Sequence, residues 1–164
     1  MNVGLLVPEL LMSGYKIFND KDILYLIGNI PPVSSWTIKS DTSGTYTPAE
    51  KINLEPAHDY IKDNYVNKYF NNSTKGYNNI WSSTDVNSMS WHNDLVEGPN
   101  LFFMYYLNDV INNGEICFRI NGEETGKIKP KKGLLLMGSQ ESYVEHKVNH
   151  TDETRVVCNF GFYV

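Results

Sequence analysis

The sequence predicts a mainly β domain with covering helices, an α+β chain whose β part forms a sandwich or barrel. The chain has 164 residues, of which 41% are hydrophobic and 13% aromatic, and this suits one well-filled core rather than two domains. After residue 75, short β-branched and aromatic runs alternate with Asn, Asp and Gly turns, as in antiparallel sheets. We therefore expect a single domain over residues 1–164. Residues 1–75 form its helix- and loop-containing support, and residues 76–164 form the β core.

One helix and one shorter element are expected in the N-terminal support. Residues 55–70 carry apolar side chains at near-helical spacing, and Pro56 suits the first turn of such a helix. Residues 20–30 predict a short helix or strand, with Asp20 or Asp22 as its cap.

Short strands are expected throughout the β core. Their ranges are residues 79–81, 88–91, 101–107, 115–120, 127–128, 134–137, 142–146 and 154–163. Asn121-Gly122 is one of the turns that separate them. The Ser-, Thr- and Gly-rich residues 40–48 precede this core and are expected to form a loop.

The last of these strands has two different faces, because alternate side chains of a strand point to opposite sides of its sheet. The small and partly polar face, which would suit the wall of a cavity, consists of Arg155, Val157, Asn159 and Gly161. The other face is expected in the core or against the covering helix, and it consists of Thr154, Val156, Cys158, Phe160 and Phe162. Phe102, Met104 and Tyr106 share a face of an earlier strand in the same way.

The charge and hydropathy of the chain exclude several classes of partner. A formal net charge of −5 argues against a nucleic-acid groove and against an anionic membrane surface as binding partners. No apolar run reaches the roughly 18 residues that a membrane span needs. The one basic cluster lies in a turn with Gly and Pro, and we interpret it as a solvated loop of Lys127, Lys129, Lys131 and Lys132.

The N-terminal and cysteine patterns favour a cytoplasmic protein. The apolar residues 3–12 lack a basic start and contain Pro8 and Glu9, which argues against a signal peptide. Cys117 and Cys158 both lie in apolar runs and do not form a Cys-X-X-Cys motif, which argues against a metal or redox site. We therefore expect buried free thiols, as in proteins of a reducing compartment. No pattern indicates an oligomeric state.

The candidate metal ligands are His92, Asp94 and His146. His92 and Asp94 are two residues apart, so both side chains point the same way in an extended chain, although a surface pair in a turn is the alternative. His146 ends a predicted strand and supplies a second imidazole. Two imidazoles and one carboxylate on one face of a metal ion form the facial triad of non-haem Fe(II) oxygenases. His150 is the alternative third ligand, whereas His58 is expected to be exposed on its helix or to act as a capping partner.

Arg155 is the candidate anchor for an acidic cosubstrate. It opens the last predicted strand, nine residues after His146, and is one of only two arginines in the chain. An Fe(II) ion with one carboxylate ligand and a doubly negative 2-oxo-dicarboxylate leaves one excess negative charge. One guanidinium neutralises that charge and can hold a carboxylate through two parallel hydrogen bonds. Arg119, the other arginine, is expected to pair with a surface acid such as Glu123 or Glu124.

Several motifs in one order carry a resemblance to a known family. They are His92-Asn93-Asp94, Tyr105-Tyr106-Leu107-Asn108-Asp109, Gly114-Glu115 with Phe118, Ile128-Lys129-Pro130 with Lys132-Gly133, Glu145-His146-Lys147-Val148 and Arg155. From His92 to the C-terminus, the chain resembles 2-oxoglutarate- and Fe(II)-dependent oxygenases of the prolyl 4-hydroxylase type, in particular the oxygen-sensing prolyl hydroxylases and their bacterial relatives. It departs from the family at Asn113-Gly114, where two glycines are common. An upstream tyrosine of the family also has no clean match, and Trp81 and Tyr77 are the nearest candidates.

The resemblance implies a fold and a set of ligands. The fold is a double-stranded β-helix, which is a distorted jelly roll with helices on one sheet. His92, Asp94 and His146 are implied to bind Fe(II). The implied cosubstrate residues are Arg155 and Tyr106, on the distal carboxylate of 2-oxoglutarate, with Asn159 and Ile116 expected as pocket walls.

The reaction implied by the resemblance is hydroxylation of a C–H bond by O2, with release of succinate and CO2 from 2-oxoglutarate. A role for ascorbate is left open. The expected substrate is a prolyl residue of a protein or peptide. The alternatives are the same chemistry on a free amino acid, a small metabolite or alkylated nucleic acid, and a jelly-roll module that binds or supports without catalysis.

Overall fold

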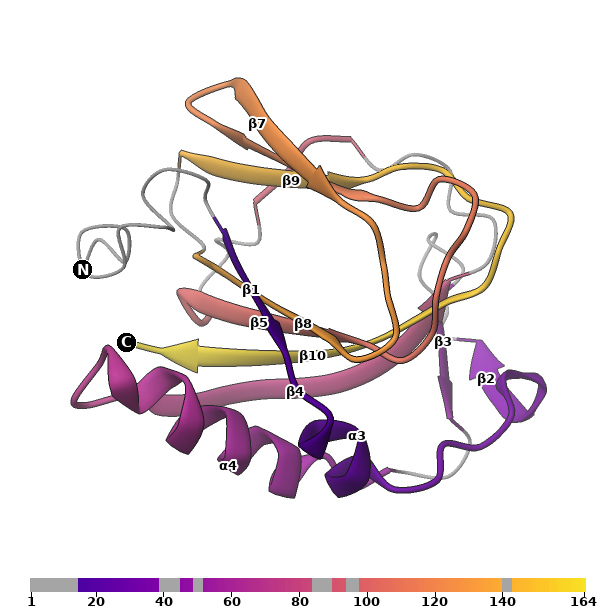
Figure 1. Ribbon diagram of the computed structural model, residues 1–164, viewed down its shortest axis with the longest axis horizontal. Helices are drawn as coiled ribbons and strands as arrows, with labels where there is room; N and C mark the ends of the chain where they lie inside the picture. Colours follow the sequence, from indigo (N-terminus) through magenta and orange to yellow (C-terminus); the bar gives the residue numbers. More distant parts are fainter. Residues whose placement is uncertain (1–14, 39–44, 49–51, 84–89, 94–97, 140–142) are drawn as a thin grey trace.

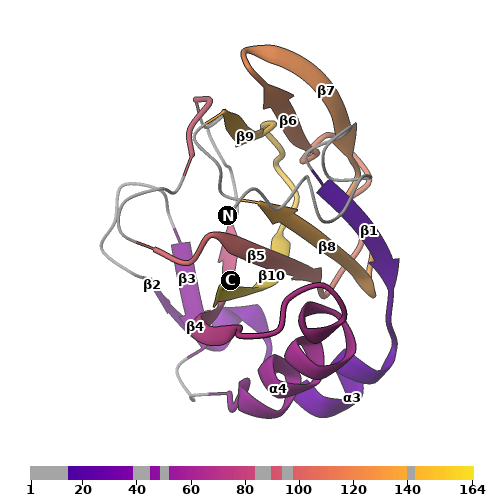
Figure 2. The same cartoon turned by 90° about the vertical axis from the view of Figure 1, so that its left-hand side faces the viewer.

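The computed structural model describes residues 15–38, 45–48, 52–83, 90–93, 98–139 and 143–164. Two antiparallel β-sheets face each other, and two helices cover the outer face of the larger sheet (Figure 1). Figure 2 shows the same three layers from the side, with the helices under the large sheet and the small sheet above it. The predicted mainly β class with covering helices, and its distorted jelly-roll architecture, are confirmed.

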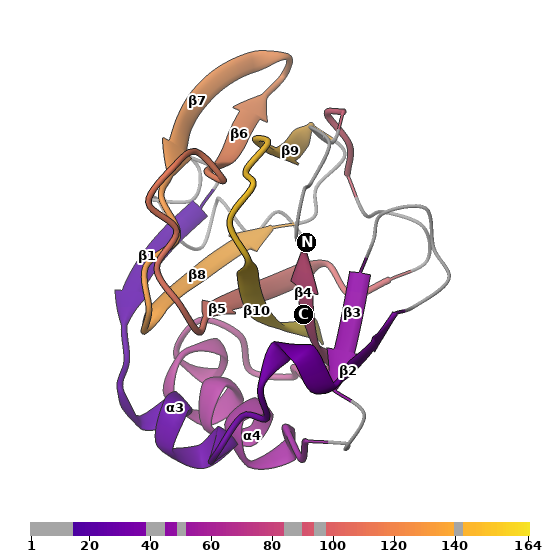
Figure 3. The ribbon, with the colours of Figure 1, turned by 90° about the vertical axis from the view of Figure 1, so that its right-hand side faces the viewer.

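The large sheet contains seven strands among the described residues. Their order across the sheet is β1 (Tyr15–Asn19), β8 (Leu134–Ser139), β5 (Leu101–Tyr106), β10 (Arg155–Tyr163), β4 (Thr74–Ser83), β3 (Thr45–Pro48) and β2 (Trp36–Ile38). The small sheet has the order β7 (Glu123–Ile128), β6 (Ile116–Ile120) and β9 (Val144–Val148). Strand β10 lies at the centre of the large sheet, between β5 and β4, and Figure 3 shows it facing the small sheet.

Within the described residues, the helices are α3 (Asp22–Ile27) and α4 (Glu55–Asn64), with short 3-10 turns at Val33–Ser35 and Val66–Lys68. The predicted helix over residues 55–70 therefore ends earlier, and a 3-10 turn follows it. The Asp20 carboxylate accepts the backbone N–H of Asp22 at 2.8 Å, so the first of the two proposed capping residues holds the start of α3.

Three strands of the N-terminal half were not predicted from the sequence. Strands β1, β2 and β3 extend the large sheet at its two sides, and the loop predicted over residues 40–48 is wrong for Thr45–Pro48. This short run pairs with β2 on one side and β4 on the other, and partners distant in sequence decide strand formation in so short a segment. Of the predicted strand at residues 88–91, residues 88 and 89 lie outside the described residues.

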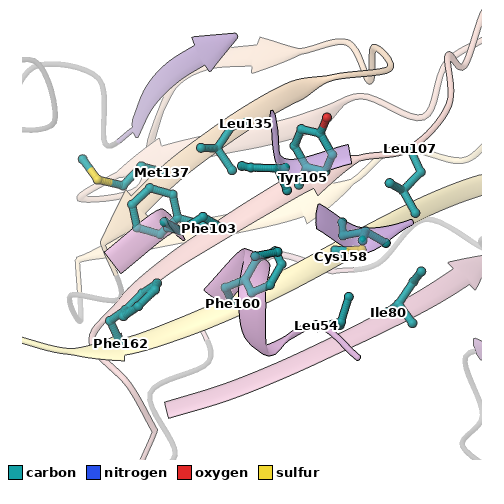
Figure 4. Packing of buried hydrophobic residues seen from close by; sticks show 14 of the residues in the cluster. Leu54, Ile80, Phe103, Tyr105, Leu107, Leu135, Met137, Cys158, Phe160 and Phe162 are labelled. Atoms are coloured by element: carbon teal, nitrogen blue, oxygen red, sulfur yellow. The ribbon is translucent and has the colours of Figure 1, made fainter. Parts of the chain in front are cut away.

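The two faces of β10 separate two hydrophobic clusters, as its alternation predicts. Val156, Cys158, Phe160 and Phe162 face the helices, where they pack with Phe103 and Tyr105 of β5 and with residues of α4 (Figure 4). Val157 belongs to the other cluster, which fills the interior between the two sheets. The buried members of that interior cluster are Phe102, Met104, Tyr106, Ile116, Phe118, Ile128, Leu134, Leu136 and Val157.

Two local features shape this interior. Asn121 and Gly122 both have positive φ angles, 52° and 82°, which is the backbone of the tight turn that joins β6 to β7. Gly138 lies under the Phe102 ring, and a Cβ atom there would lie 2.3 Å from the ring. The glycine therefore lets Phe102 lie across β8 inside the molecule.

The structure places His58 inside the molecule, so the prediction of an exposed helix position is wrong. Its side chain is 1% exposed, on the face of α4 that contacts Phe160 and Phe162. The register of β10 against β4 shifts at Gly161, and the Gly161 carbonyl accepts the Nε2–H of His58 at 3.1 Å. Asn78 donates to the Nδ1 atom of the ring at 3.2 Å, so the buried imidazole is neutral.

Burial lowers the pKa of His58 below its ordinary value of 6.5, although its hydrogen bond to Gly161 acts in the other direction. The unfolded chain therefore binds a proton at this position more readily than the folded protein does. The stability that the neutral ring contributes is present above about pH 6.5 and is lost as the pH falls below that value.

We expect His58→Gln to reduce the pH dependence of unfolding between pH 7 and pH 5, because glutamine keeps one donor and one acceptor but does not titrate. Urea unfolding at several pH values measures the slope for both proteins. Glu55, Asp59 and Lys75 surround the same helix face and stay unchanged in both, so only the difference in slope is compared. Equal slopes would contradict the prediction.

No helix in the described part of the chain is both long enough and apolar enough to cross a membrane.

Candidate active site

Two of the predicted metal ligands, His92 and His146, lie side by side. Their backbones exchange two hydrogen bonds of 3.1 and 2.9 Å, which adds His92 to the edge of the small sheet beside β9. Their ring centroids are 4.4 Å apart. The His146 ring also lies near Phe102 and Phe118 of the interior cluster, at 5.9 and 6.3 Å, so this pair faces the space between the sheets.

The His92 ring has a defined hydrogen bond. Its Nδ1 atom lies 2.8 Å from the Ser90 carbonyl oxygen, which can only accept. The Nδ1–H therefore donates, and the neutral ring carries its lone pair on Nε2. A metal-ligating histidine commonly has this arrangement, with one nitrogen held by a carbonyl and the other directed at the ion.

The residue before His92 fastens this segment to the outer face of the small sheet. The Trp91 ring lies between the Arg119 guanidinium, at 4.8 Å, and the Lys147 ammonium group, at 4.7 Å. Such contacts stabilise by cation–π attraction. Because neighbouring residues of an extended segment point to opposite sides, the outward Trp91 favours the inward direction of His92.

Arg119 is paired with Glu145, not with Glu123 or Glu124 as the sequence analysis expected. Two hydrogen bonds of 2.6 and 2.8 Å join the guanidinium to the carboxylate, and they hold the pKa of Glu145 below its ordinary value. The residues lie opposite each other on β6 and β9, and this cross-strand register brings them together.

The third predicted ligand, Asp94, lies outside the described residues. Within those residues, no group of three or more metal-ligating side chains is found, and the two imidazoles stand as a pair. The alternative ligand His150 is exposed, in the loop that follows β9. His146 rather than His150 therefore shares the interior with His92, while the metal assignment itself stays a prediction.

Arg155, the predicted cosubstrate anchor, is buried at the start of β10 with 1% of its surface exposed. Its guanidinium carbon lies 5.3 Å from the Tyr106 ring centroid and 5.6 Å from that of Trp81. Neither Nε nor Nη2 of Arg155 has a hydrogen-bond partner among the described residues, and the same holds for the Tyr106 hydroxyl. Buried charged donors are costly unless an acceptor meets them, so this end of the interior suits an anion.

The remaining predicted residues line the same interior. Ile116 is fully buried in the interior cluster together with Tyr106. Asn159 is half-buried on the Arg155 face of β10, and its side-chain Nδ2–H donates to the side-chain Oδ1 of Asn79 at 2.9 Å. The structure thus brings Arg155, Tyr106 and Ile116 into one region, with Asn159 further along the strand.

Trp81 is the residue that the sequence analysis did not assign to the site. It faces Val157 across the β4–β10 pair, packs against the interior cluster and contacts Arg155. A partial signal for it existed, because Trp81 and Tyr77 were the nearest candidates for the upstream tyrosine of the family, although neither matched cleanly. The register that places it against Arg155 could not be known from one sequence.

The donor set fits the cofactors that the family resemblance implies. Two adjacent imidazoles suit a divalent transition metal, and a buried guanidinium with unsatisfied donors next to a tyrosine hydroxyl suits a carboxylate. The imidazoles come from the small sheet and the guanidinium from the large sheet. A ligand that reaches both would therefore lie in the interior between the sheets.

The fold is the one found in 2-oxoglutarate- and Fe(II)-dependent oxygenases of the prolyl hydroxylase type. No protein-family model matches the chain, and no curated protein matches it in sequence. Among solved structures, a prolyl hydroxylase of Trichoplax adhaerens, in complex with a hypoxia inducible factor peptide fragment, is similar with a TM-score of 0.71 at 14% identity. That alignment covers 98% of this chain and 88% of the other.

Two bacterial structures are similar over nearly the whole chain. A 2OG-Fe(II) oxygenase family oxidoreductase of Burkholderia pseudomallei has a TM-score of 0.71 at 12% identity, over 99% of this chain and 91% of the other. A prolyl-4-hydroxylase of Pseudomonas putida has a TM-score of 0.68 at 13% identity, over 98% of each chain. The resemblance seen in the sequence is confirmed at the level of the fold.

Proposed function

We propose that this chain is an Fe(II)- and 2-oxoglutarate-dependent dioxygenase that hydroxylates a C–H bond. The observation that carries the proposal is the buried Arg155, whose unsatisfied donors lie beside the Tyr106 hydroxyl in the interior of an oxygenase fold. A purely structural module gains nothing from burying such a charge, because an unpaired buried guanidinium only destabilises the fold. The succinate assay below distinguishes a dioxygenase from a module that binds an anion without catalysis. The proposal treats residues 1–164 as one oxygenase domain.

His92, Asp94 and His146 would hold the iron in this proposal. When bound, Fe(II) supplies the activation of O2 for which protein side chains have no chemistry, and 2-oxoglutarate supplies two electrons and leaves as succinate and CO2. The hydrogen bond from His92 Nδ1 to the Ser90 carbonyl oxygen orients the ring and leaves Nε2 as the nitrogen that would bind the ion.

The other side chains bind and orient the cosubstrate. Arg155 would donate its Nε and Nη2 hydrogens to the distal carboxylate of 2-oxoglutarate, and the Tyr106 hydroxyl would donate to the same group. Trp81 and Tyr106 flank the guanidinium and limit its movement. Ile116, Phe118 and Val157 keep water out of the interior, which strengthens every polar contact made there.

A prolyl residue of a protein or peptide is the substrate that we propose. Two of the similar structures are prolyl hydroxylases, and one of these holds a peptide. The net charge of −5 does not favour nucleic acid. Cys117 and Cys158 are buried free thiols, which supports the cytoplasm as the compartment.

The test measures succinate formation and O2 consumption with Fe(II), 2-oxoglutarate and ascorbate, with and without a panel of proline-containing peptides. We expect succinate formation that requires both iron and 2-oxoglutarate, and a peptide product heavier by one oxygen atom. If succinate forms but no prolyl peptide gains an oxygen atom, the prolyl assignment is wrong. The substrate then belongs to one of the alternatives, which are free amino acids, small metabolites and alkylated nucleic acid. No iron-dependent succinate formation under any condition would overturn the enzyme assignment.

A further inference from the structure

Asn108 makes two hydrogen bonds to the peptide groups on either side of Arg155. Its side-chain Nδ2–H donates to the Thr154 carbonyl oxygen at 2.7 Å, and its Oδ1 accepts the Val156 N–H at 2.8 Å. Both hydrogen bonds of Asn108 are therefore made to the backbone on either side of Arg155, the predicted cosubstrate anchor.

These bonds replace strand pairing at the point where it stops. Strand β5 ends at Tyr106, and the last backbone bond of this pair runs from the Leu107 N–H to the Val156 carbonyl at 3.0 Å. On the other side, Arg155 pairs with Ser83 of β4. The Asn108 amide thus supplies on the β5 side the two bonds that a continued strand would have made, and the backbone of Arg155 is held from both sides.

We infer that Asn108 is a positioning residue for Arg155, which fixes the start of β10 so that the guanidinium points between Tyr106 and Trp81. This inference rests on the proposed function, in which Arg155 holds the distal carboxylate of 2-oxoglutarate. A guanidinium held between two rings can bind a carboxylate with both donors only while its backbone stays in place, because bidentate geometry tolerates little displacement.

The chain provides a matched control at the other end of the same strand pair. Asn100 immediately precedes β5, and its Oδ1 accepts the Val164 N–H at 2.9 Å while its Nδ2–H donates to the Val164 carbonyl at 3.0 Å. Asn100 and Asn108 therefore each make two hydrogen bonds to backbone groups, Asn100 to the residue that follows β10 and Asn108 at the start of β10. Of these two asparagines, only Asn108 binds the peptide groups next to Arg155. If Asn108 only stabilised the fold, the Asn100 and Asn108 variants would affect 2-oxoglutarate binding to a similar extent.

The experiment compares the wild-type protein with Asn108→Ala and Asn100→Ala. Isothermal titration calorimetry gives the affinity for Mn(II) alone and the affinity of the Mn(II)-loaded protein for 2-oxoglutarate, and thermal unfolding gives the stability cost of each change. For Asn108→Ala we expect about tenfold weaker 2-oxoglutarate binding, the size that loss of a hydrogen-bonded geometry gives. Mn(II) affinity should stay within about threefold, and Asn100→Ala should lower stability comparably without weakening 2-oxoglutarate binding.

Equal 2-oxoglutarate affinities of Asn108→Ala and wild type, or equal losses in both asparagine variants, would overturn the inference. Arg155→Ala in the same series separates this outcome from failure of the proposed function. If Arg155→Ala also binds 2-oxoglutarate as wild type does, the proposed cosubstrate site fails and the inference falls with it. Should Asn108→Ala not fold, Asn108→Ser carries the same test, since serine has one polar atom on a shorter side chain where asparagine uses two, Nδ2 and Oδ1.

Discussion

His146→Ala is expected to weaken binding of Mn(II) or Fe(II) by at least about 100-fold. Loss of a residue that only hydrogen-bonds to a metal ligand usually lowers metal affinity by less than this. The reason is that His146 shares the interior with His92, 4.4 Å between ring centroids, and would supply one of two imidazole ligands. Calorimetric titration of the metal measures the effect, and turnover should be lost with it.

His150→Ala is the control for this change. His150 is four residues further on, is exposed, and offers the same imidazole chemistry. Its replacement should leave metal affinity unchanged. Wild-type affinity in His146→Ala, or a loss in His150→Ala, would show that the ligand set has been assigned to the wrong histidine.

Arg155→Ala is expected to weaken 2-oxoglutarate binding by about 2–5 kcal/mol, or roughly 30-fold to several thousand-fold, because it removes the charge partner of a buried carboxylate. Metal affinity should change little. The effect on stability should be small or even favourable, since alanine removes a buried guanidinium whose Nε and Nη2 have no partner among the described residues.

Arg119→Ala is the matched control, because it removes the only other arginine in the chain. Arg119 is partly exposed and bound to Glu145 on the outer face of the small sheet. Its loss should leave 2-oxoglutarate affinity as it is. If Arg119→Ala and Arg155→Ala gave the same affinity, a general charge effect would explain both, and the anchor would have to be sought elsewhere.

The sequence predicted the second half of the fold well, because that half carries a strong local signal. The alternation along residues 154–163 separated the face of Val156 and Phe160 from that of Val157, and the structure places the two faces in different hydrophobic clusters. Strands β1 to β3 were missed because they are short and carry a weak local signal. β1 and β3 pair with β8 and β4, which are distant in sequence, and β2 pairs with β3, which is also short. His58 was placed wrongly because a histidine on a helix gives no sign of the strand carbonyl that it meets.

For the candidate site, residue type and spacing singled out His92, His146 and Arg155, and the structure brings the two histidines together and buries the arginine. Their roles stay predictions, as does that of Asp94, which lies outside the described residues. The contact of Trp81 with Arg155 and the two hydrogen bonds of Asn108 were not predicted, because both follow from strand register. The hydrophobic pattern shows which face of a strand is buried, but it did not show which residues of β4, β5 and β10 lie opposite one another.

The division of the site between two sheets has a consequence for folding. The imidazole pair belongs to the edge of the small sheet, and the guanidinium belongs to the centre of the large one. Neither sheet alone could recognise iron together with its acidic cosubstrate. A state in which only one sheet has formed would therefore lack half of the proposed site, so joint binding of metal and cosubstrate would report that both sheets are formed and packed together.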